Sequence, residues 1–310
     1  MNLNKLSENI VINLMIKSEI LTHFIMKFST ISKIIRFWIK QKFWKIKKII
    51  KPEIEKTIPI WTRLEIDIQS DCNRDCFFCP RYKDRSGIRK DSNGKHIKKS
   101  MPTWKIKDIL DQTAKLGFKG RLAFHRLSEP FLDNRYIELA KYAKNKGIKI
   151  HENTNGDILK KNTNLCNKLD GLLDTIVIGL YDYKNGEERK KQMKFWKNRF
   201  KKTHVLFSLA AEYPRIRKNS KLYDKKMVTE KIRNKPCYAT NGLRVRYDGE
   251  VSLCCQDDQC KAKLGNVFKS SIKDIWWSKK HIKIVNTLKS PGGRKLVSVC
   301  KNCVSGPGKQ

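Results

Sequence analysis

The sequence predicts an α/β fold, a partial (β/α) barrel with a small C-terminal module, and three observations lead to this prediction. Short strand-like runs recur along the middle of the chain, after the first at roughly the 30-residue step of a βαβ unit. Stretches with helical periodicity separate these runs. Cysteines gather in two groups, one directly after the first strand and one near the C-terminus. Because barrels of this kind collect functional groups at the carboxyl ends of their strands, the first group falls where a site is expected.

The barrel is expected to contain five parallel strands joined by right-handed crossovers. The strand-like runs lie at residues 64–69, 121–125, 148–151, 175–178 and 204–207. The first helix is expected to be capped by Thr103 and to end before Gly117, and its apolar face consists of Ile106, Ile109, Leu110 and Ala114. The next helix is expected to begin at Asp133 and to end at Gly147. Residues 211–236 offer no clear sixth strand.

The pattern changes after residue 236 to that of a small module. Two strand-like runs, 243–247 and 250–253, flank the pair Asp248-Gly249, which is typical of a type I′ hairpin turn. A short helix from Ile272 to about Leu288 is expected to follow. We therefore divide the chain into an N-terminal extension, a barrel, a connecting segment and a C-terminal module, with the ranges 1–58, 59–212, 213–236 and 237–310.

Composition limits the classes of function. The chain has 310 residues, of which 39% are hydrophobic, and can bury a core. Its formal net charge of +38 favours non-specific contact with polyanions. The charge is spread along the chain, however, and no nucleic-acid-binding motif focuses it, so a nucleic-acid substrate is not favoured. The ten cysteines mostly fall in two groups, and no clean signal peptide precedes them, which favours a reducing cytoplasm over a disulfide-bonded secreted protein.

The N-terminal extension has the pattern of a basic amphipathic helix, seen clearly at residues 31–40. It lacks the roughly 18 uncharged apolar residues in a row that would span a membrane. Contact with an anionic membrane surface is one interpretation. We favour docking against the barrel, or a true start at Met15 or Met26.

The most specific feature is the run that contains Cys72, Cys76 and Cys79, with Phe78 just before the last cysteine. Three thiolates at this spacing can hold three irons of a 4Fe-4S cluster and leave the fourth iron free. Structural zinc needs four ligands and disulfides need an oxidising compartment, so both alternatives fit less well. The run resembles the signature of the radical S-adenosylmethionine (radical SAM) superfamily. In that superfamily the free iron binds the amino and carboxylate groups of SAM, which is cleaved to a 5′-deoxyadenosyl radical.

Two further segments resemble elements of the same superfamily. The exit of the second strand carries Glu129 before a proline, similar to the Gly-Gly-Glu-Pro element whose acid accepts a hydrogen bond from the SAM ammonium group. Leu127 and Ser128 replace its glycines, and larger side chains there would narrow the pocket. The third strand ends in Thr154-Asn155 before a glycine, similar to a polar turn at the cofactor rim. The resemblance thus implies cofactor contacts by Phe78, Glu129, Thr154 and Asn155.

The remaining positions at the strand ends are open. The fourth strand carries Gly179 where family members often have a ribose-contacting serine, which leaves Tyr181 and Asp182 as candidates. His125 and Arg126 lie where a substrate would meet them, and an arginine there would hold a carboxylate or phosphate. A structurally satisfied histidine is an equally good interpretation. The catalytic candidates are therefore His125, Arg126 and, from the C-terminal module, Cys260.

The second cysteine group resembles the SPASM or shorter Twitch extension of radical SAM enzymes, and it comprises Cys237, Cys254, Cys255, Cys260, Cys300 and Cys303. Six thiolates suit one auxiliary 4Fe-4S cluster better than two. Neighbouring strand residues point to opposite faces, so one of Cys254 and Cys255 is expected to ligate, and we favour Cys254. Cys260 is then spare, and a zinc ribbon remains an alternative. Cys166 is expected to be an ordinary helix residue.

The resemblance covers about residues 62–303 and implies an oxidoreductase-like radical SAM enzyme. The favoured function is dehydrogenation of a small polar substrate, such as an amino-cyclitol or sugar, with the auxiliary cluster taking the second electron. A flavodoxin or ferredoxin is the implied electron donor. The alternatives are a peptide maturase, an epimerase that returns a hydrogen atom from Cys255 or Cys260, and a non-catalytic iron-sulfur or redox-sensing protein. The last would explain Leu127, Ser128 and Gly179 as marks of a degraded pocket.

Overall fold

The computed structural model describes residues 58–84, 93, 95, 97–183, 185–209, 216 and 220–304. The predictions for the N-terminal extension, apart from Ile58, lie outside these residues. Within the described part of the chain no helix is long and apolar enough to cross a membrane.

The strands form one sheet in the order β5-β4-β3-β2-β1-β6-β7. Their bounds are Arg63–Ile66 (β1), Arg121–Ala123 (β2), Lys149–Thr154 (β3), Thr175–Gly179 (β4), His204–Ser208 (β5), Gly242–Val245 (β6) and Val251–Ser252 (β7). The first six strands pair in parallel, and β7 is antiparallel to β6. All five predicted strands are present. Since β5 and β7 are the edges of the described sheet, the barrel is open, as predicted.

The sixth parallel strand is the first arm of the predicted hairpin. β6 pairs with β1 along its whole length, with Arg63 opposite Gly242 and Ile66 opposite Val245, and it also pairs with β7. All four of its residues are buried. The sequence pattern showed only the hairpin, because pairing with a strand 179 positions earlier leaves no local signal. The barrel and the C-terminal module therefore share a strand.

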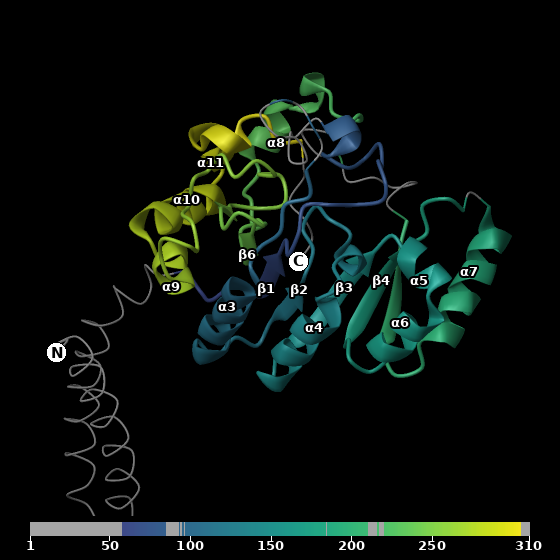
Figure 1. Cartoon of the computed structure of the whole chain (residues 1–310). Coiled ribbons are helices and arrows are strands. Elements are labelled where there is room, and N and C mark those ends of the chain that lie inside the picture. Colours follow the sequence, from purple (N-terminus) through teal and green to yellow (C-terminus); the bar gives the residue numbers. More distant parts are fainter. Residues whose placement is uncertain are drawn as a thin grey trace, which may run out of the picture. The chain divides into compact units, whose positions relative to one another are not determined.

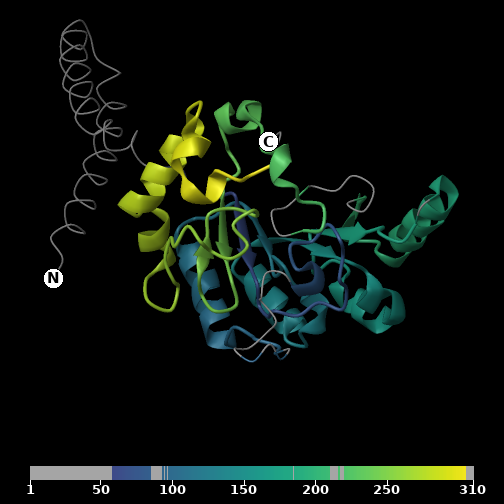
Figure 2. The ribbon, with the colours of Figure 1, turned by 90° about the horizontal axis from the view of Figure 1, so that it is seen from above.

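The helices surround this sheet on its outer side and at its two ends (Figure 1). Their bounds are Thr103–Lys115 (α3), Tyr136–Asn145 (α4), Asp157–Lys161 (α5), Thr163–Leu169 (α6), Gly186–Arg199 (α7), Glu230–Asn234 (α8), Ile272–Trp276 (α9), Lys279–Lys289 (α10) and Gly293–Leu296 (α11). Seen from above, the C-terminal helices in yellow lie on the side opposite α7 (Figure 2).

Two predicted helix starts were wrong by one to three residues. Pro102 occupies the N-cap of α3, and Thr103 is its first helical residue, whose hydroxyl accepts a hydrogen bond from Arg135 at 3.1 Å. α4 begins at Tyr136, because Asp133 uses its carboxylate to accept the backbone N–H of Arg135 before the helix starts. The side chain of Arg135 donates hydrogen bonds to both Thr103 and Asp133, the two predicted helix starts.

The predicted C-terminal helix was also wrong, because it is two helices, α9 and α10. The helical conformation is interrupted between Trp276 and Ser278. Ser278 is the N-cap of α10, and its hydroxyl accepts a hydrogen bond from the backbone N–H of His281 at 3.2 Å. Serine is a strong N-cap, and it favours a new helix start over continuation of the old one. The break lets α9 and α10 take different directions against the sheet.

A tryptophan cluster joins the start of the barrel to α9. Trp61 packs edge-on against Trp276 with ring centroids 5.2 Å apart. The indole N–H groups of Trp276 and Trp277 donate to the carbonyls of Pro59 and Ile58 at 2.9 and 2.8 Å. Because Trp61 and Trp276 are almost fully buried, this cluster ties the C-terminal module to the barrel.

We expect Trp276→Ala to lower the free energy of unfolding by about 3–5 kcal/mol, since it removes a large buried ring and a buried hydrogen bond. Urea unfolding followed by circular dichroism measures this change. Trp104→Ala is the matched control, because Trp104 is 62% exposed and its loss is expected to cost less than about 1 kcal/mol. Equal effects of the two substitutions would contradict the tertiary role of Trp276.

Candidate active site and auxiliary cluster site

A cavity of about 280 Å³ lies at the carboxyl ends of the strands. The thiols of Cys72, Cys76 and Cys79 line it together with Phe78. Burial, followed by the charges of Cys79 and Cys72, raises the pKa of Cys76 to about 12. The three thiols would repel one another as thiolates, so a metal cluster that takes their charge fits the site.

The described residues contain no group of three Cys, His, Asp or Glu side chains placed to hold one metal ion. A four-iron cluster spaces its thiolate ligands more widely than a single zinc ion does. The three thiols share the wall of one cavity, which is the arrangement that a cluster needs.

The cysteine loop is fastened to two other strand ends through Arg74. Its guanidinium lies 2.5 Å from an oxygen of Asp157, the first residue of α5, and 2.6 Å from an oxygen of Asp182, after β4. Asn73 donates to the same Asp157 at 2.8 Å. Asp182, a predicted ribose candidate, is therefore engaged by Arg74. Sequence reasoning missed this clamp, although an arginine inside the cysteine run was a signal for it.

Glu129 is buried at the cavity wall and is held by the turn after β3. The Thr154 hydroxyl donates to one carboxylate oxygen at 2.7 Å, and the Asn155 backbone N–H donates to the other at 2.9 Å. Burial raises the pKa of Glu129 to about 7. The predicted cofactor residues Glu129, Thr154 and Asn155 thus lie together. Thr154 and Asn155 hold the Glu129 carboxylate in place through these hydrogen bonds.

The two residues that replace glycines before Glu129 have their own partner. The backbone N–H of Leu127 and the hydroxyl of Ser128 both donate to Asp67 Oδ1, at 2.9 and 3.1 Å. Asp67 directly follows β1 and is buried. The loop therefore gains an anchor from the side chain that departs from the family pattern, and its shape does not depend on glycine here.

Gly179 makes room for Tyr181. A Cβ atom at Gly179 would lie 2.2 Å from the Tyr181 ring. That ring lines the cavity and packs edge-on against Phe78 with centroids 5.2 Å apart. Burial raises the pKa of Tyr181 to about 12, so its hydroxyl is neutral at physiological pH. Of the two predicted ribose candidates, Tyr181 is the one that faces the cavity.

We expect Gly179→Ser to weaken SAM binding at least about tenfold, because the new Cβ displaces the Tyr181 ring. The double variant Gly179→Ser/Tyr181→Ala is expected to recover part of the loss. Gly186→Ser is the matched control, since a Cβ there meets no atom within 4 Å. Equilibrium dialysis of the reconstituted proteins with labelled SAM measures the three affinities. Unchanged binding in the single variant would refute the steric argument.

Of the three catalytic candidates, His125 and Arg126 both line the cavity, whereas Cys260 does not. His125 lines the cavity, and its Nδ1 contacts the buried carboxylate of Glu152. Arg126 donates from Nη2 to the backbone carbonyls of Asp257 and Asp258 at 2.7 and 3.0 Å. The Cys260 thiol lies 3.9 Å from Arg126 Nη2 and does not line the cavity.

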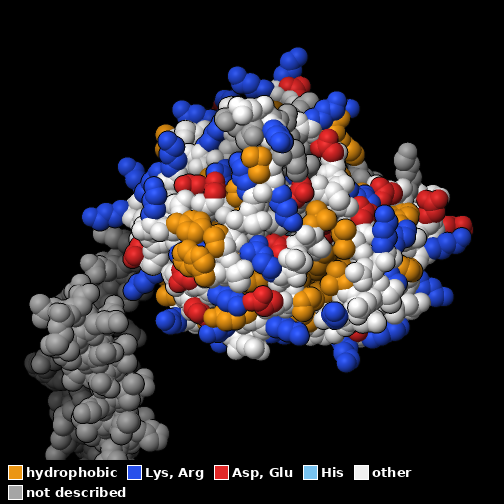
Figure 3. Space-filling model, in the orientation of Figure 1, with side chains coloured by type: hydrophobic (Ala, Val, Ile, Leu, Met, Phe, Trp, Pro, Cys, Tyr) orange, Lys and Arg blue, Asp and Glu red, His pale blue; other side chains and the backbone are white. Residues whose placement is uncertain are grey.

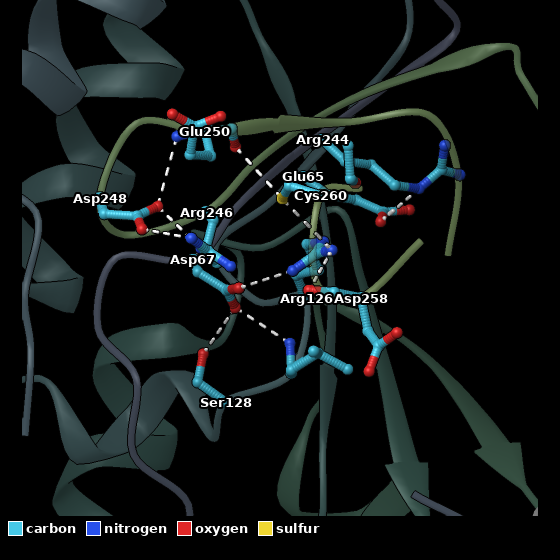
Figure 4. Close-up of polar contacts among 12 residues, drawn as sticks. Glu65, Asp67, Arg126, Ser128, Arg244, Arg246, Asp248, Glu250, Asp258 and Cys260 are labelled. Carbon is cyan, nitrogen blue, oxygen red and sulfur yellow. Dashed lines mark hydrogen bonds and ion pairs between the residues drawn. The ribbon is translucent and has the colours of Figure 1, made fainter. Parts of the chain in front are cut away.

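Arg126 belongs to a buried charge network between the barrel and the hairpin (Figure 4). Its Nη1 lies 3.6 Å from Asp67, and Arg244 on β6 donates to Glu65 on β1 at 2.8 Å. Both Arg126 and Arg244 are almost fully buried. Removing the carboxylate partner of either arginine would leave a buried charge without compensation and destabilise the fold. The network fixes the loop that carries the second cysteine group relative to the first site.

Five of the six C-terminal cysteines surround a second, smaller cavity of about 60 Å³. They are Cys237, Cys254, Cys255, Cys300 and Cys303. Burial, followed by the charges of Cys303 and Cys237, raises the pKa of Cys300 to about 12. Cys254 is half-buried, and its pKa is raised by the loss of solvation and then by the charge of Cys255. The donor set fits an auxiliary cluster, and since both Cys254 and Cys255 line the cavity, the choice of Cys254 as the ligand stays a prediction.

Cys260 and Cys166 lie apart from both thiol groups. Cys260 is buried beside Arg126, and its thiol faces the Glu250 carbonyl at 3.8 Å. Cys166 is buried in α6 and donates to the Leu159 carbonyl at 3.3 Å. The structure thus places each of them as a packed side chain.

Known proteins resemble the chain in both parts. Residues 237–304 match the SPASM family, described as an iron-sulfur cluster-binding domain. The chain is 26% identical over 266 residues to an S-adenosyl-L-methionine-dependent 2-deoxy-scyllo-inosamine dehydrogenase of Niallia circulans, which covers 79% of this chain and 93% of that protein. Residues 237–304 thus form a domain of the SPASM family, and the chain as a whole is similar to a SAM-dependent dehydrogenase.

Solved structures support the fold of this enzyme. The crystal structure of BtrN in complex with AdoMet and 2-DOIA has a TM-score of 0.60 to it at 22% identity, and covers 80% of this chain and 94% of that one. The structure of BtrN in an open conformation has a TM-score of 0.57 at the same identity and coverage. The likeness supports the partial-barrel fold, and the SPASM match adds an iron-sulfur cluster-binding domain at residues 237–304.

Proposed function

We propose that this enzyme oxidises a hydroxyl-bearing carbon of a small polar substrate, of the amino-cyclitol or sugar class, to a carbonyl. The observation that carries the proposal is the similarity to the inosamine dehydrogenase over 93% of that protein's length. The two thiol-lined cavities support it, because one site starts the reaction and the other takes an electron at its end. Bound SAM and the first cluster supply a 5′-deoxyadenosyl radical that removes hydrogen from carbon.

The residues of the first cavity have distinct tasks in this proposal. Cys72, Cys76 and Cys79 hold the SAM-binding cluster, and Arg74 keeps their loop in place. Glu129 accepts a hydrogen bond from the ammonium group of SAM. The hydrogen bonds from Thr154 and Asn155 hold its carboxylate in the orientation that this contact needs.

The departures from the family pattern are compatible with a working pocket. Leu127 and Ser128 are anchored on Asp67, and Gly179 accommodates Tyr181. We therefore favour an enzyme over a redox-sensing protein. Cys260 does not line the cavity, which disfavours it as the hydrogen donor of an epimerase.

An acidic flavodoxin or ferredoxin is the proposed electron donor. Such a partner complements the net charge of +38. Lys and Arg side chains are scattered over the visible face of the molecule and do not form one stripe (Figure 3). This distribution fits a transient, salt-sensitive encounter better than a nucleic-acid groove.

The test of the function uses anaerobically purified, reconstituted full-length enzyme with SAM and a strong reductant. A panel of amino-cyclitols and sugars deuterated at carbinol carbons is added, and 5′-deoxyadenosine and product mass are measured. Dehydrogenation predicts deuterium in 5′-deoxyadenosine and a product lighter by the two hydrogens of an alcohol oxidation. A product that keeps its hydroxyl group but has the carbinol deuterium replaced by hydrogen would indicate epimerisation and refute the dehydrogenase.

We expect Cys300→Ala to separate the two sites. The iron content is expected to fall from about eight to about four per chain, because only the auxiliary cluster is lost. Deoxyadenosine should still form, whereas the oxidised product should fall at least about tenfold. Cys260→Ala is the control, since Cys260 lies outside the second cavity, and its iron content should not change. A full iron complement in Cys300→Ala would remove Cys300 from the ligand set.

A further inference from the structure

The cavity wall contains a histidine-carboxylate pair that neither cluster site uses. His125, in the loop after β2, lines the cavity and keeps 17% of its side chain exposed. Its Nδ1 contacts an oxygen of Glu152 on β3, whose side chain has no exposed surface. The pair therefore has one end in the cavity and the other in the core.

Glu152 is held as a hydrogen-bond acceptor. The backbone N–H of Phe124 donates to Oε2 at 2.8 Å, and the backbone N–H of Asn153 donates to Oε1 at 3.1 Å. The Tyr136 hydroxyl adds a third donor, 3.0 Å from Oε2. Backbone N–H groups can only donate, so both carboxylate oxygens accept. His125 must therefore present Nδ1–H to Glu152, which leaves the lone pair of the neutral ring on Nε2.

Nε2 is the ring atom available to a ligand. It lies 2.8 Å from the side-chain nitrogen of Asn153, an exposed residue that also lines the cavity. An amide N–H that donates to Nε2 occupies the position that a substrate hydroxyl would take. A histidine with one nitrogen oriented by a buried carboxylate and the other facing a pocket has the geometry of a general base.

Charged groups around the ring increase its basicity. Burial lowers the pKa of His125, but the charges of Glu152, Glu65 and Asp67 outweigh it and raise the pKa above 6.5. Glu65 and Asp67 come from β1 and the loop after it, and Glu152 comes from β3. Their combined field favours proton capture by the ring.

We propose that His125 is the general base that takes the hydroxyl proton of the substrate through Nε2, with Glu152 as its positioning residue. The proposal rests on the proposed function, since it needs an alcohol substrate. It identifies the substrate class at this wall as a carbinol whose O–H lies within hydrogen-bond reach of Nε2.

The step balances as follows for a substrate carbon that has already lost its hydrogen atom. The O–H bond breaks, its proton goes to Nε2, and its electron pair remains on oxygen. The single electron on carbon leaves to a one-electron oxidant of the iron-sulfur class as the C=O double bond forms. The imidazolium that results is stabilised by Glu152 and later releases the proton to solvent.

The experiment compares His125→Gln, Glu152→Gln and the control His151→Gln. His151 lies on the same strand as Glu152 but does not line the cavity. Each reconstituted protein is given SAM, reductant and a carbinol-deuterated substrate. Deuterium transfer into 5′-deoxyadenosine and ketone formation are measured separately across pH. Imidazole nitrogen NMR of each protein as purified gives the tautomer of His125.

His125→Gln is expected to keep deuterium transfer but to lose ketone formation about 100-fold or more. In the wild type, ketone formation should rise with pH through a value above 6.5, and Glu152→Gln should move this rise to lower pH. The NMR spectrum should show Nδ1–H in the wild type and lose this preference in Glu152→Gln. His151→Gln should match the wild type.

Three results would overturn the proposal. Ketone formation within about threefold of wild type in His125→Gln would show that another group takes the proton. An Nε2–H tautomer in the wild type would contradict the assigned lone pair. Absence of deuterium transfer from every alcohol in the wild type would instead reject the proposed function, and the assignment of His125 would fall with it.

Discussion

Replacing Cys76 by alanine is expected to abolish reductive cleavage of SAM, with 5′-deoxyadenosine at the level of a reaction without enzyme. Cys76 is the middle thiol of the three that line the first cavity, and a cluster with two protein ligands would not persist. Deoxyadenosine measured by chromatography after anaerobic reconstitution tests this expectation. The iron content should fall by about four per chain, and the auxiliary cluster should remain.

Cys166→Ala provides the control for this result. It removes a thiol of the same chemistry from the core of α6, away from both cavities. Iron content and SAM cleavage should match the wild type, with a modest loss of stability. SAM cleavage that survives in Cys76→Ala would reject the ligand set proposed for the first cluster.

Glu129→Gln is expected to have the second largest effect, a loss of SAM affinity of about 10- to 100-fold. A hydrogen bond to a charged group contributes roughly 1.5–3 kcal/mol. In the wild type, the Thr154 hydroxyl and the Asn155 backbone N–H each donate to one carboxylate oxygen of Glu129. Glutamine has only one oxygen, so its NH₂ group would face one of these donors. Calorimetric titration of the reconstituted protein with SAM measures the affinity. Binding within about twofold of wild type would show that the ammonium group lies elsewhere.

The pH dependence of SAM binding gives an independent check on Glu129. Its pKa is raised to about 7 by burial, so below this pH the carboxyl is protonated and accepts the ammonium group less well. A bound ammonium favours the carboxylate, so binding releases a proton and strengthens as pH rises through about 7. Glu129→Gln should lack this dependence. A wild-type affinity that is constant from pH 6 to 8 would contradict the assignment.

The sequence alone determined the five barrel strands, the two cysteine groups and the identity of Glu129 as the acid of the second strand exit. These features depend on local periodicity or on side chains whose chemistry is itself specific. A run of alternating apolar residues can form few structures, and thiols at a fixed spacing have few uses. The SPASM match at residues 237–304 and the 26% identity to a SAM-dependent dehydrogenase agree with the resemblance that these features indicated.

The contacts between distant side chains could be seen only in the folded chain. β6 pairs with a strand 179 positions earlier, Arg126 binds carbonyls 131 and 132 positions later, and Glu152 holds His125 across two strands. The reason for a glycine at position 179 becomes clear only when the Tyr181 ring is seen to lie where a Cβ atom would be. The physical reason is that such contacts depend on strand register and on the curvature of the sheet, which no local pattern encodes. Local sequence patterns thus indicated the cofactors, and the fold brings His125, the proposed base, into the same cavity as the first three cysteines.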